Sequence, residues 1–189
     1  MSGMILERAT FRLSLLLGAL LLAGCAGLEE RACDAHEERM RGVKPVTVYR
    51  AVDPTPGQTA PRVLPNGSVP MVTTYKLSFK PRFTKPCTSL DLLKDVTVQR
   101  SAETAVVLNE IREFYAEDGT LIASNSQDIS AQVSRSGVYV ATTPLPIPKA
   151  APPGKYKIVS KLMYERRGNN RPAVQLARAE GFFYIIPRD

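Results

Sequence analysis

Residues 71–80 alternate between two kinds of side chain more regularly than any other stretch of the chain. One face carries Met71, Thr73, Tyr75, Leu77 and Phe79, and the other carries Val72, Thr74, Lys76, Ser78 and Lys80. A period of two residues is typical of a β-strand with one buried face and one wet face. We therefore predict a half-buried strand over residues 71–80.

Other short stretches, rich in β-branched and aromatic residues, predict further strands. They cover residues 45–52, 96–100, 105–108, 111–115, 120–123, 129–133, 138–142, 155–166 and 175–186. Asp118-Gly119 predicts a hairpin between 111–115 and 120–123, and Ser136-Gly137 predicts one between 129–133 and 138–142. Charged residues 34–41 predict a short helix that ends at Gly42, and residues 89–93 a single helical turn.

Proline and glycine separate these stretches. Residues 53–70 contain five prolines, so we predict a long surface loop there, with Asn66-Gly67 as a turn. Residues 143–153 contain five more prolines, and Gly154 opens the next strand. Many short strands with hardly any helical periodicity indicate an all-β fold, a single antiparallel β-sandwich over residues 45–189.

Pro152-Pro153-Gly154-Lys155-Tyr156 resembles the entry into a late strand of immunoglobulin-like sandwiches. The resemblance implies an immunoglobulin-like topology, with Tyr156 at the place where a tyrosine corner forms.

The first 25 residues have the parts of a secretory signal. Arg8 and Arg12 precede an apolar run over residues 13–22, and the small pair Ala23-Gly24 follows it. The run is shorter than the ~20 residues that a spanning helix needs. An anchor that is never removed and an ordinary signal that leaves Cys25 free are the alternatives.

Leu22-Ala23-Gly24-Cys25 resembles the lipobox of bacterial lipoproteins that are processed by signal peptidase II. The resemblance implies that residues 1–24 are a signal peptide and that Cys25 becomes the acylated first residue. Residues 25–44 would then form a lipidated tether that includes the short helix. Ala26, where inner-membrane retention signals carry aspartate, implies the outer membrane, facing the periplasm.

With Cys25 assigned to lipid, Cys33 and Cys87 remain. An even number of cysteines in an oxidising compartment predicts a disulfide bond. The alternative is a metal, but two cysteines and the single His36 do not make a set of four ligands. We therefore expect no metal and no cofactor.

The formal net charge is +7, and removal of the leader with Arg8, Arg12 and Glu7 leaves +6. Basic residues gather near the C-terminus: Lys155, Lys157, Lys161, Arg166, Arg167 and Arg171. A strand that buries Tyr156, Ile158, Leu162 and Tyr164 points the lysines outward. This basic stripe is interpreted either as a solvated strand face or as a docking surface for an anionic polymer, lipid headgroups or an acidic protein.

The composition offers little for catalysis, because a single histidine suggests no Ser-His-Asp arrangement. We do not expect an enzyme, and we do not expect nucleic acid as a partner outside the cytoplasm. The leading hypothesis is a lipid-anchored β-sandwich that binds or scaffolds another envelope component, such as part of a secretion or trans-envelope assembly. The alternatives are a carbohydrate- or peptidoglycan-binding module, which the absence of tryptophan disfavours, and a carboxylate-based hydrolase.

Overall fold

The structure is a computed structural model that describes residues 28–57, 59–168 and 172–188. It divides into two compact units, Met1–Val43 and Lys44–Asp189. The predicted leader, Cys25 and Arg171 lie outside the described residues. In the described ranges no helix is long and apolar enough to cross a membrane.

The first unit contains a helix over residues 28–40. The helix predicted over residues 34–41 is therefore present, and it already includes residue 28, the first residue that the structure describes. The added residues include Leu28, Glu29, Glu30 and Arg31, which are good helix formers.

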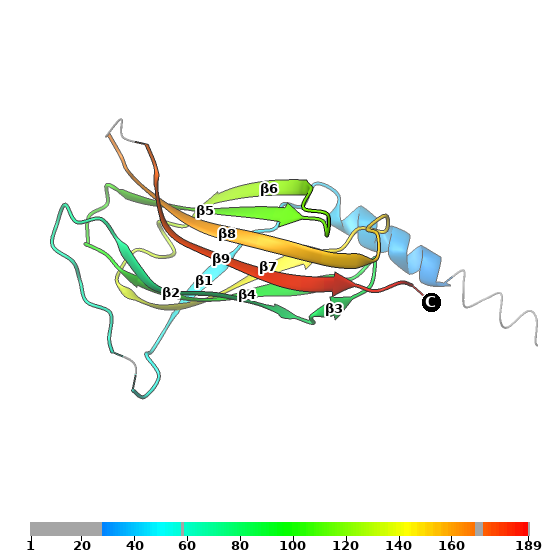
Figure 1. Cartoon of the computed structure of the whole chain (residues 1–189), viewed down its shortest axis with the longest axis horizontal. Helices are drawn as coiled ribbons and strands as arrows, with labels where there is room; N and C mark the ends of the chain where they lie inside the picture. Colours follow the sequence, from blue (N-terminus) through cyan, green and yellow to red (C-terminus); the bar gives the residue numbers. More distant parts are fainter. Residues whose placement is uncertain (1–27, 58, 169–171, 189) are drawn as a thin grey trace, which may run out of the picture. The chain divides into compact units, whose positions relative to one another are not determined.

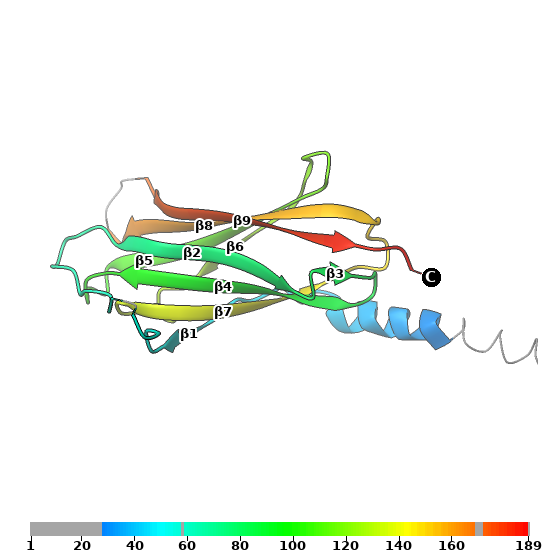
Figure 2. The same ribbon diagram turned by 60° about the horizontal axis from the view of Figure 1, so that its bottom comes forward.

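The second unit is a pair of β-sheets that face each other (Figures 1 and 2). One sheet has the strand order β1-β7-β4-β2 and the other β3-β9-β8-β5-β6. Neighbouring strands are antiparallel, except that β3 runs parallel to β9. The strands are β1 (Val48–Val52), β2 (Met71–Lys80), β3 (Phe83–Thr84), β4 (Ser89–Gln99), β5 (Val106–Tyr115), β6 (Leu121–Asp128), β7 (Gly137–Pro146), β8 (Gly154–Arg166) and β9 (Val174–Ile185).

The strand order is that of an immunoglobulin-like sandwich, which has one sheet of strands A, B, E and D and a second built around C, F and G. β2, β4 and β7 take the places of A, B and E, and β5, β8 and β9 those of C, F and G. The place of strand D, beside β7, is filled by the N-terminal β1. The predicted all-β, immunoglobulin-like sandwich is confirmed.

A tyrosine corner is present at the start of β8. The hydroxyl of Tyr156 donates a hydrogen bond to the carbonyl oxygen of Pro152 at 2.7 Å. This bond fixes the loop that leads from β7 into the strand in the place of F, as in other sandwiches of this type.

The core between the sheets has two apolar clusters. One includes Tyr49, Val96, Val98, Leu108 and Tyr139, and the other includes Leu90, Leu92, Leu145, Ile158 and Phe183. Burial of these side chains supplies the main favourable free energy of folding.

The alternation along residues 71–80 predicts the right strand but not the phase of all its side chains. A β-bulge shifts the pairing of β2 with β4 between Val72 and Thr74. As a result Val72 packs against the core, together with Tyr75, Leu77 and Phe79, whereas Met71 is 54% exposed. A bulge places one extra residue in one strand and so changes the face of the residues before it.

Two local predictions are wrong. Residues 89–93 are not a helical turn but the start of β4, in which Leu90 and Leu92 alternate into the core. Residues 129–133 form a turn in which the N–H of Val133 donates to the carbonyl of Ile129. The chain therefore crosses here from β6 in one sheet to β7 in the other, and no hairpin forms around Ser136-Gly137.

The segment before β1 closes part of the sandwich edge between β7 and β6. The amide side chain of Gln127 on β6 accepts from the N–H of Thr47 at 2.7 Å and donates to its carbonyl at 2.8 Å. Gln132 accepts in the same way from the N–H of Tyr49. These side chains satisfy backbone groups that would otherwise lack a strand partner at the edge.

The cysteine count predicts a disulfide, and Cys33 and Cys87 are both disulfide-bonded. The described residues contain no group of three or more His, Cys, Asp or Glu side chains that could hold a metal ion.

Candidate functional site

The predicted basic stripe lies on the outer face of the five-stranded sheet. Along β8 the even-numbered side chains, such as Ile158 and Leu162, point into the core, so Lys155, Lys157 and Lys161 point outward together. Arg166 ends the strand, Arg167 is exposed in the following turn, and the position of Arg171 is not described.

Two members of the stripe are neutralised by carboxylates. Lys161 pairs with Glu113 at 2.6 Å, and Arg166 pairs with Glu103 at 3.1 Å. The charges of Lys161 and Arg166 are therefore largely balanced by carboxylates. Fewer residues of the stripe carry an uncompensated charge than the sequence indicates.

Lys155 and Lys157 contact aromatic rings instead. The ammonium of Lys155 lies 4.4 Å from the centre of the Phe182 ring, and that of Lys157 lies 5.0 Å from the Tyr115 ring. Both distances are within the range of a cation–π interaction. No ion pair of either lysine is found in the described part of the chain.

The same pattern continues toward the edge strand β3. The rings of Phe83 and Tyr184 stack with centres 5.1 Å apart, and the guanidinium of Arg82 lies 5.7 Å from the Tyr184 ring. Tyr184 is opposite Lys155 in the β8–β9 ladder, so the two groups are contiguous. We call this surface the cation–aromatic face; its members are Arg82, Phe83, Tyr115, Lys155, Lys157, Phe182 and Tyr184. The sequence predicts Lys155 and Lys157 but neither Arg82 nor the rings, because those residues come from other parts of the chain: the β2–β3 turn, β3, β5 and β9.

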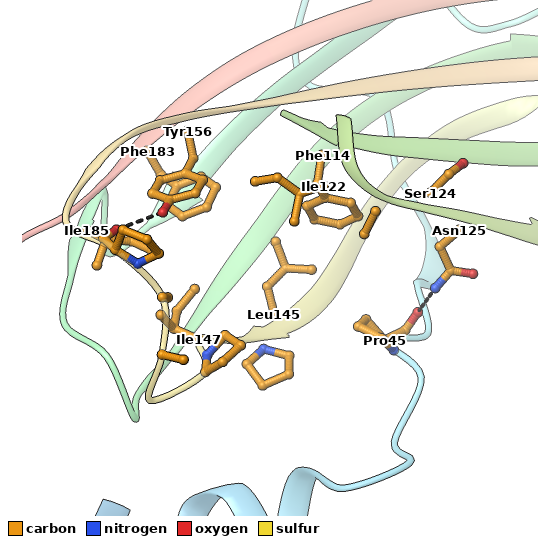
Figure 3. Close-up of a pocket in the computed structure, with 16 residues that line it drawn as sticks. Pro45, Phe114, Ile122, Ser124, Asn125, Leu145, Ile147, Tyr156, Phe183 and Ile185 are labelled. Carbon is orange, nitrogen blue, oxygen red and sulfur yellow. Dashed lines mark hydrogen bonds between the residues drawn. The ribbon is translucent and has the colours of Figure 1, made fainter. Parts of the chain in front are cut away.

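A second feature, which the sequence did not predict, is an apolar pocket of about 510 Å³ at the sandwich edge (Figure 3). It lies beyond the start of β1: the first residue of β1, Val48, pairs with Thr142, and β7 continues to Pro146 without a strand partner on that side. Side chains from both sheets and from the loop after β7 line it, including Phe114, Ile122, Leu145, Ile147, Tyr156 and Phe183. We call it the apolar pocket.

The apolar pocket has a few polar groups, and the hydroxyl of Tyr156 is already bonded to the carbonyl of Pro152. Ser124 and Asn125 of β6 line it, and the amide of Asn125 donates to the carbonyl of Pro45 at 3.4 Å (Figure 3). None of the described residues that line the pocket is an aspartate or a glutamate.

A third feature is a group of buried charges inside the sandwich. Lys94 of β4 and Glu110 of β5 form an ion pair at 2.5 Å, and both side chains are fully buried. Arg112 lies 3.9 Å from the same carboxylate and donates to Thr47 and to the carbonyl of Pro45. Hydroxyls complete the network, since Ser160 donates to Glu110 and Lys94 donates to Thr143. We call Lys94, Glu110 and Arg112 the buried charge cluster.

The pKa values of Lys94 and Glu110 are both below their usual values, for different reasons. Burial lowers the pKa of Lys94 to about 8, although the charge of Glu110 acts against the shift. Burial acts to raise the pKa of Glu110, but the charge and hydrogen bond of Lys94, with the charge of Arg112, outweigh it and hold that pKa below its usual value. The cluster lies inside the sandwich and reaches the wall of the apolar pocket at one point, because Arg112 donates to the carbonyl oxygen of the lining residue Pro45.

The fold and the surface together define an immunoglobulin-like β-sandwich with an aromatic and basic outer face and an apolar edge pocket. No family model matches the chain, and no curated protein matches it. Among solved structures it is similar to the CARDB domain of PF1109 from Pyrococcus furiosus, with 14% identity, a TM-score of 0.37, and coverage of 63% of this chain and 96% of that one. It is also similar to a PapD-like domain of human CEP192, with 10% identity, a TM-score of 0.37, and coverage of 71% and 100%. Likenesses at this level carry no argument about function.

Proposed function

We propose that the chain is a lipid-anchored, non-catalytic envelope protein whose sandwich binds an acidic envelope component through the cation–aromatic face. The observation that carries the proposal is the pairing of Lys155 and Lys157 with aromatic rings instead of carboxylates. A lysine held over a ring keeps its full charge, so the surface retains a positive potential that an acidic partner complements.

The aromatic rings add contact area to this potential. Phe83 is 58% exposed although it stacks on Tyr184. Interfaces are enriched in aromatic residues and arginine, both of which this surface presents together. The lipid anchor at Cys25, inferred from the lipobox, would hold the face close to other components of the envelope.

The test is a charge reversal with a matched control. We expect that Lys155→Glu/Lys157→Glu in the full-length chain abolishes crosslinking to the partner in intact envelopes. The control is Lys76→Glu/Lys80→Glu on the outer face of the other sheet, where both positions are exposed and the change in net charge is the same. The fold should survive, because an exposed cation–π contact contributes only about 0.5–1 kcal/mol. Equal loss in both variants, or no loss in either, would contradict the proposal.

A carbohydrate- or peptidoglycan-binding role is the second candidate, and the exposed stacked pair Phe83–Tyr184 favours it. If the chain binds peptidoglycan, Phe83→Ala should abolish cosedimentation with purified peptidoglycan, both in buffer without added salt and in buffer with added salt. Binding to an acidic protein should instead weaken steeply with salt, because screening acts beyond about 8 Å at physiological ionic strength.

A further inference from the structure

The disulfide bond connects the proposed lipid anchor to the sandwich by a short covalent path. Cys33 and Cys87 are both disulfide-bonded, and the chain has three cysteines in all, so these two are bonded to each other. Residues 28–33 are helical and rise about 1.5 Å per residue. The steps from Cys25 to residue 28 add at most about 11 Å, so Cys25 is within about 20 Å of Cys33. Because Cα atoms of bonded cysteines are at most about 7 Å apart, Cys87 is within about 30 Å of the anchor in any arrangement of the two units.

Cys87 belongs to the end of the sandwich where the cation–aromatic face meets β3. It follows β3 closely, and β3 is held on the end of β9 by two backbone hydrogen bonds. The N–H of Tyr184 donates to the carbonyl of Arg82 at 2.9 Å, and that of Ile186 donates to the carbonyl of Thr84 at 2.8 Å. Figure 2 shows β3 beside the end of β9, with the start of β9 at the opposite end of the sandwich. That opposite end is roughly 35–40 Å away, since β9 has 12 residues and a strand rises about 3.3 Å per residue.

The side chains at the Cys87 end suit the boundary between lipid headgroups and acyl chains. Phe83 is 58% exposed and stacks on Tyr184. Arg82 lies over the Tyr184 ring, and Lys155 is opposite Tyr184 in the β8–β9 ladder. Tyrosine, with an apolar ring and a polar tip, is typical of membrane interfaces, where exposed apolar side chains enter the acyl boundary. Basic side chains beside a membrane are attracted to anionic headgroups.

The charge of this end is positive. No ion pair of Arg82 or Lys155 is found among the residues that the structure describes. One carboxylate is close to Lys155, since Glu117 accepts from its backbone N–H at 3.4 Å, and it offsets part of that lysine's charge. The guanidinium of Arg82 contacts the Tyr184 ring instead of a carboxylate.

We propose that Arg82, Phe83, Lys155 and Tyr184 dock on the anionic lipid surface of the membrane that holds the anchor. The inference rests on the proposed function, because it names the headgroup layer as the acidic component that the cation–aromatic face binds. A membrane is favoured over an acidic protein because the anchor, within about 30 Å of Cys87, already holds this end near headgroups. Docking is then an intramolecular step at high effective concentration, whereas a protein partner must arrive from solution.

The experiment uses tryptophan fluorescence, because the chain contains no tryptophan and Phe83→Trp introduces a single fluorophore at the proposed contact. The acylated mature chain, verified by intact mass, is reconstituted into vesicles of equal parts phosphatidylcholine and phosphatidylglycerol. We expect the emission of the Phe83→Trp variant to shift to shorter wavelength and to be quenched when the phosphatidylcholine carries bromine on its acyl chains. In vesicles of phosphatidylcholine alone, both effects should be much smaller.

Val174→Trp is the matched control for position. Val174 is 48% exposed at the start of β9, the end of the sandwich opposite β3. Both variants carry the same anchor, so both are held at the same concentration on the vesicle. We expect no quenching of the Val174→Trp variant.

Two charge reversals in the Phe83→Trp chain test the cations. Arg82→Glu/Lys155→Glu should remove most of the quenching, because two attractions to headgroups become repulsions. Arg50→Glu/Lys76→Glu makes the same change in net charge at exposed positions of β1 and β2 in the other sheet, and it should leave the quenching unchanged.

Any of four results would overturn the inference: equal quenching at the two tryptophan positions, an equal effect of the two charge reversals, equal quenching with and without phosphatidylglycerol, or a mature chain without an acyl group. Absence of quenching in every vesicle would overturn it too. If Lys155→Glu/Lys157→Glu still loses its crosslink in envelopes, the partner is then an acidic protein and the proposed function stands. Unchanged crosslinking in that variant would instead contradict the proposed function itself, so the two failures are distinguishable.

Discussion

At the scale of single residues, the buried charge cluster is the least expected part of the molecule. Lys94 and Glu110 occupy inward positions on β4 and β5, where alternation alone predicts apolar side chains. A buried ion pair adds little net stability compared with apolar residues, but removal of one partner leaves a charge without compensation. The cluster therefore adds little to the free energy of folding, but it restricts which single substitutions the core tolerates at these positions.

We expect Glu110→Gln to lower the free energy of unfolding by about 3–5 kcal/mol, because Lys94 and Arg112 stay buried without their carboxylate. Glu113→Gln is the control. Glu113 also pairs with a lysine, Lys161, but both side chains are partly exposed, and such pairs contribute less than about 1 kcal/mol. Urea unfolding of the two variants measures the difference, and similar losses in both would contradict the account.

The low pKa of Lys94 also makes a prediction about pH. Its pKa is about 8 in the folded chain against an ordinary value of 10.5, so between these values the unfolded chain binds more protons. Stability from this group therefore rises as pH increases above about 8. We expect the stability difference between wild type and Lys94→Met to shift in favour of wild type from pH 7.5 to 9.5. A difference that stays constant over this range would contradict the assignment.

At the scale of elements, local patterns predict the strands well where alternation and turn residues agree. The Asp118-Gly119 hairpin between β5 and β6 and the outward lysines of β8 are examples. The sequence does not predict the start of β4, because the outward Leu93 is apolar and the inward Lys94 is charged, and both obscure the alternation of Leu90 and Leu92. The turn at residues 129–133 was missed because its buried Ile129 and Val133 look like a strand in sequence. The apolar pocket depends on where β1 starts beside β7, and local sequence carries no signal for that register.

Close contact between β2 and β9 gives a prediction at the same scale. A Cβ added at Gly181 would lie 2.7 Å from the ring of Phe79, so the residue must lack a side chain. We expect Gly181→Ala to cost about 1–3 kcal/mol through overpacking. Gly181→Ala/Phe79→Leu should recover part of that loss relative to Phe79→Leu alone, since a smaller side chain leaves room for the methyl group. Additive losses in a double-mutant cycle would show that the contact is not the cause.

At the scale of the whole molecule, the two surface sites lie on different parts of one sandwich, and the proposed anchor would confine both to a membrane surface. The cation–aromatic face covers the outer side of the five-stranded sheet, and the apolar pocket opens at the edge between β7 and β6.

The anchor gives the last prediction. If Cys25 carries the lipid, the intact mass of the mature chain should correspond to residues 25–189 plus a diacylglyceryl group, with or without an added N-acyl chain. One acyl chain gives only marginal binding to a membrane, whereas two or more hold a protein stably. Cys25→Ser should therefore move the chain from the membrane fraction to the soluble fraction or stop its processing. Density fractionation of the wild type should place it in the outer membrane, as Ala26 implies. A mature chain that begins at another residue, or a Cys25→Ser chain that fractionates and is processed like the wild type, would contradict the assignment.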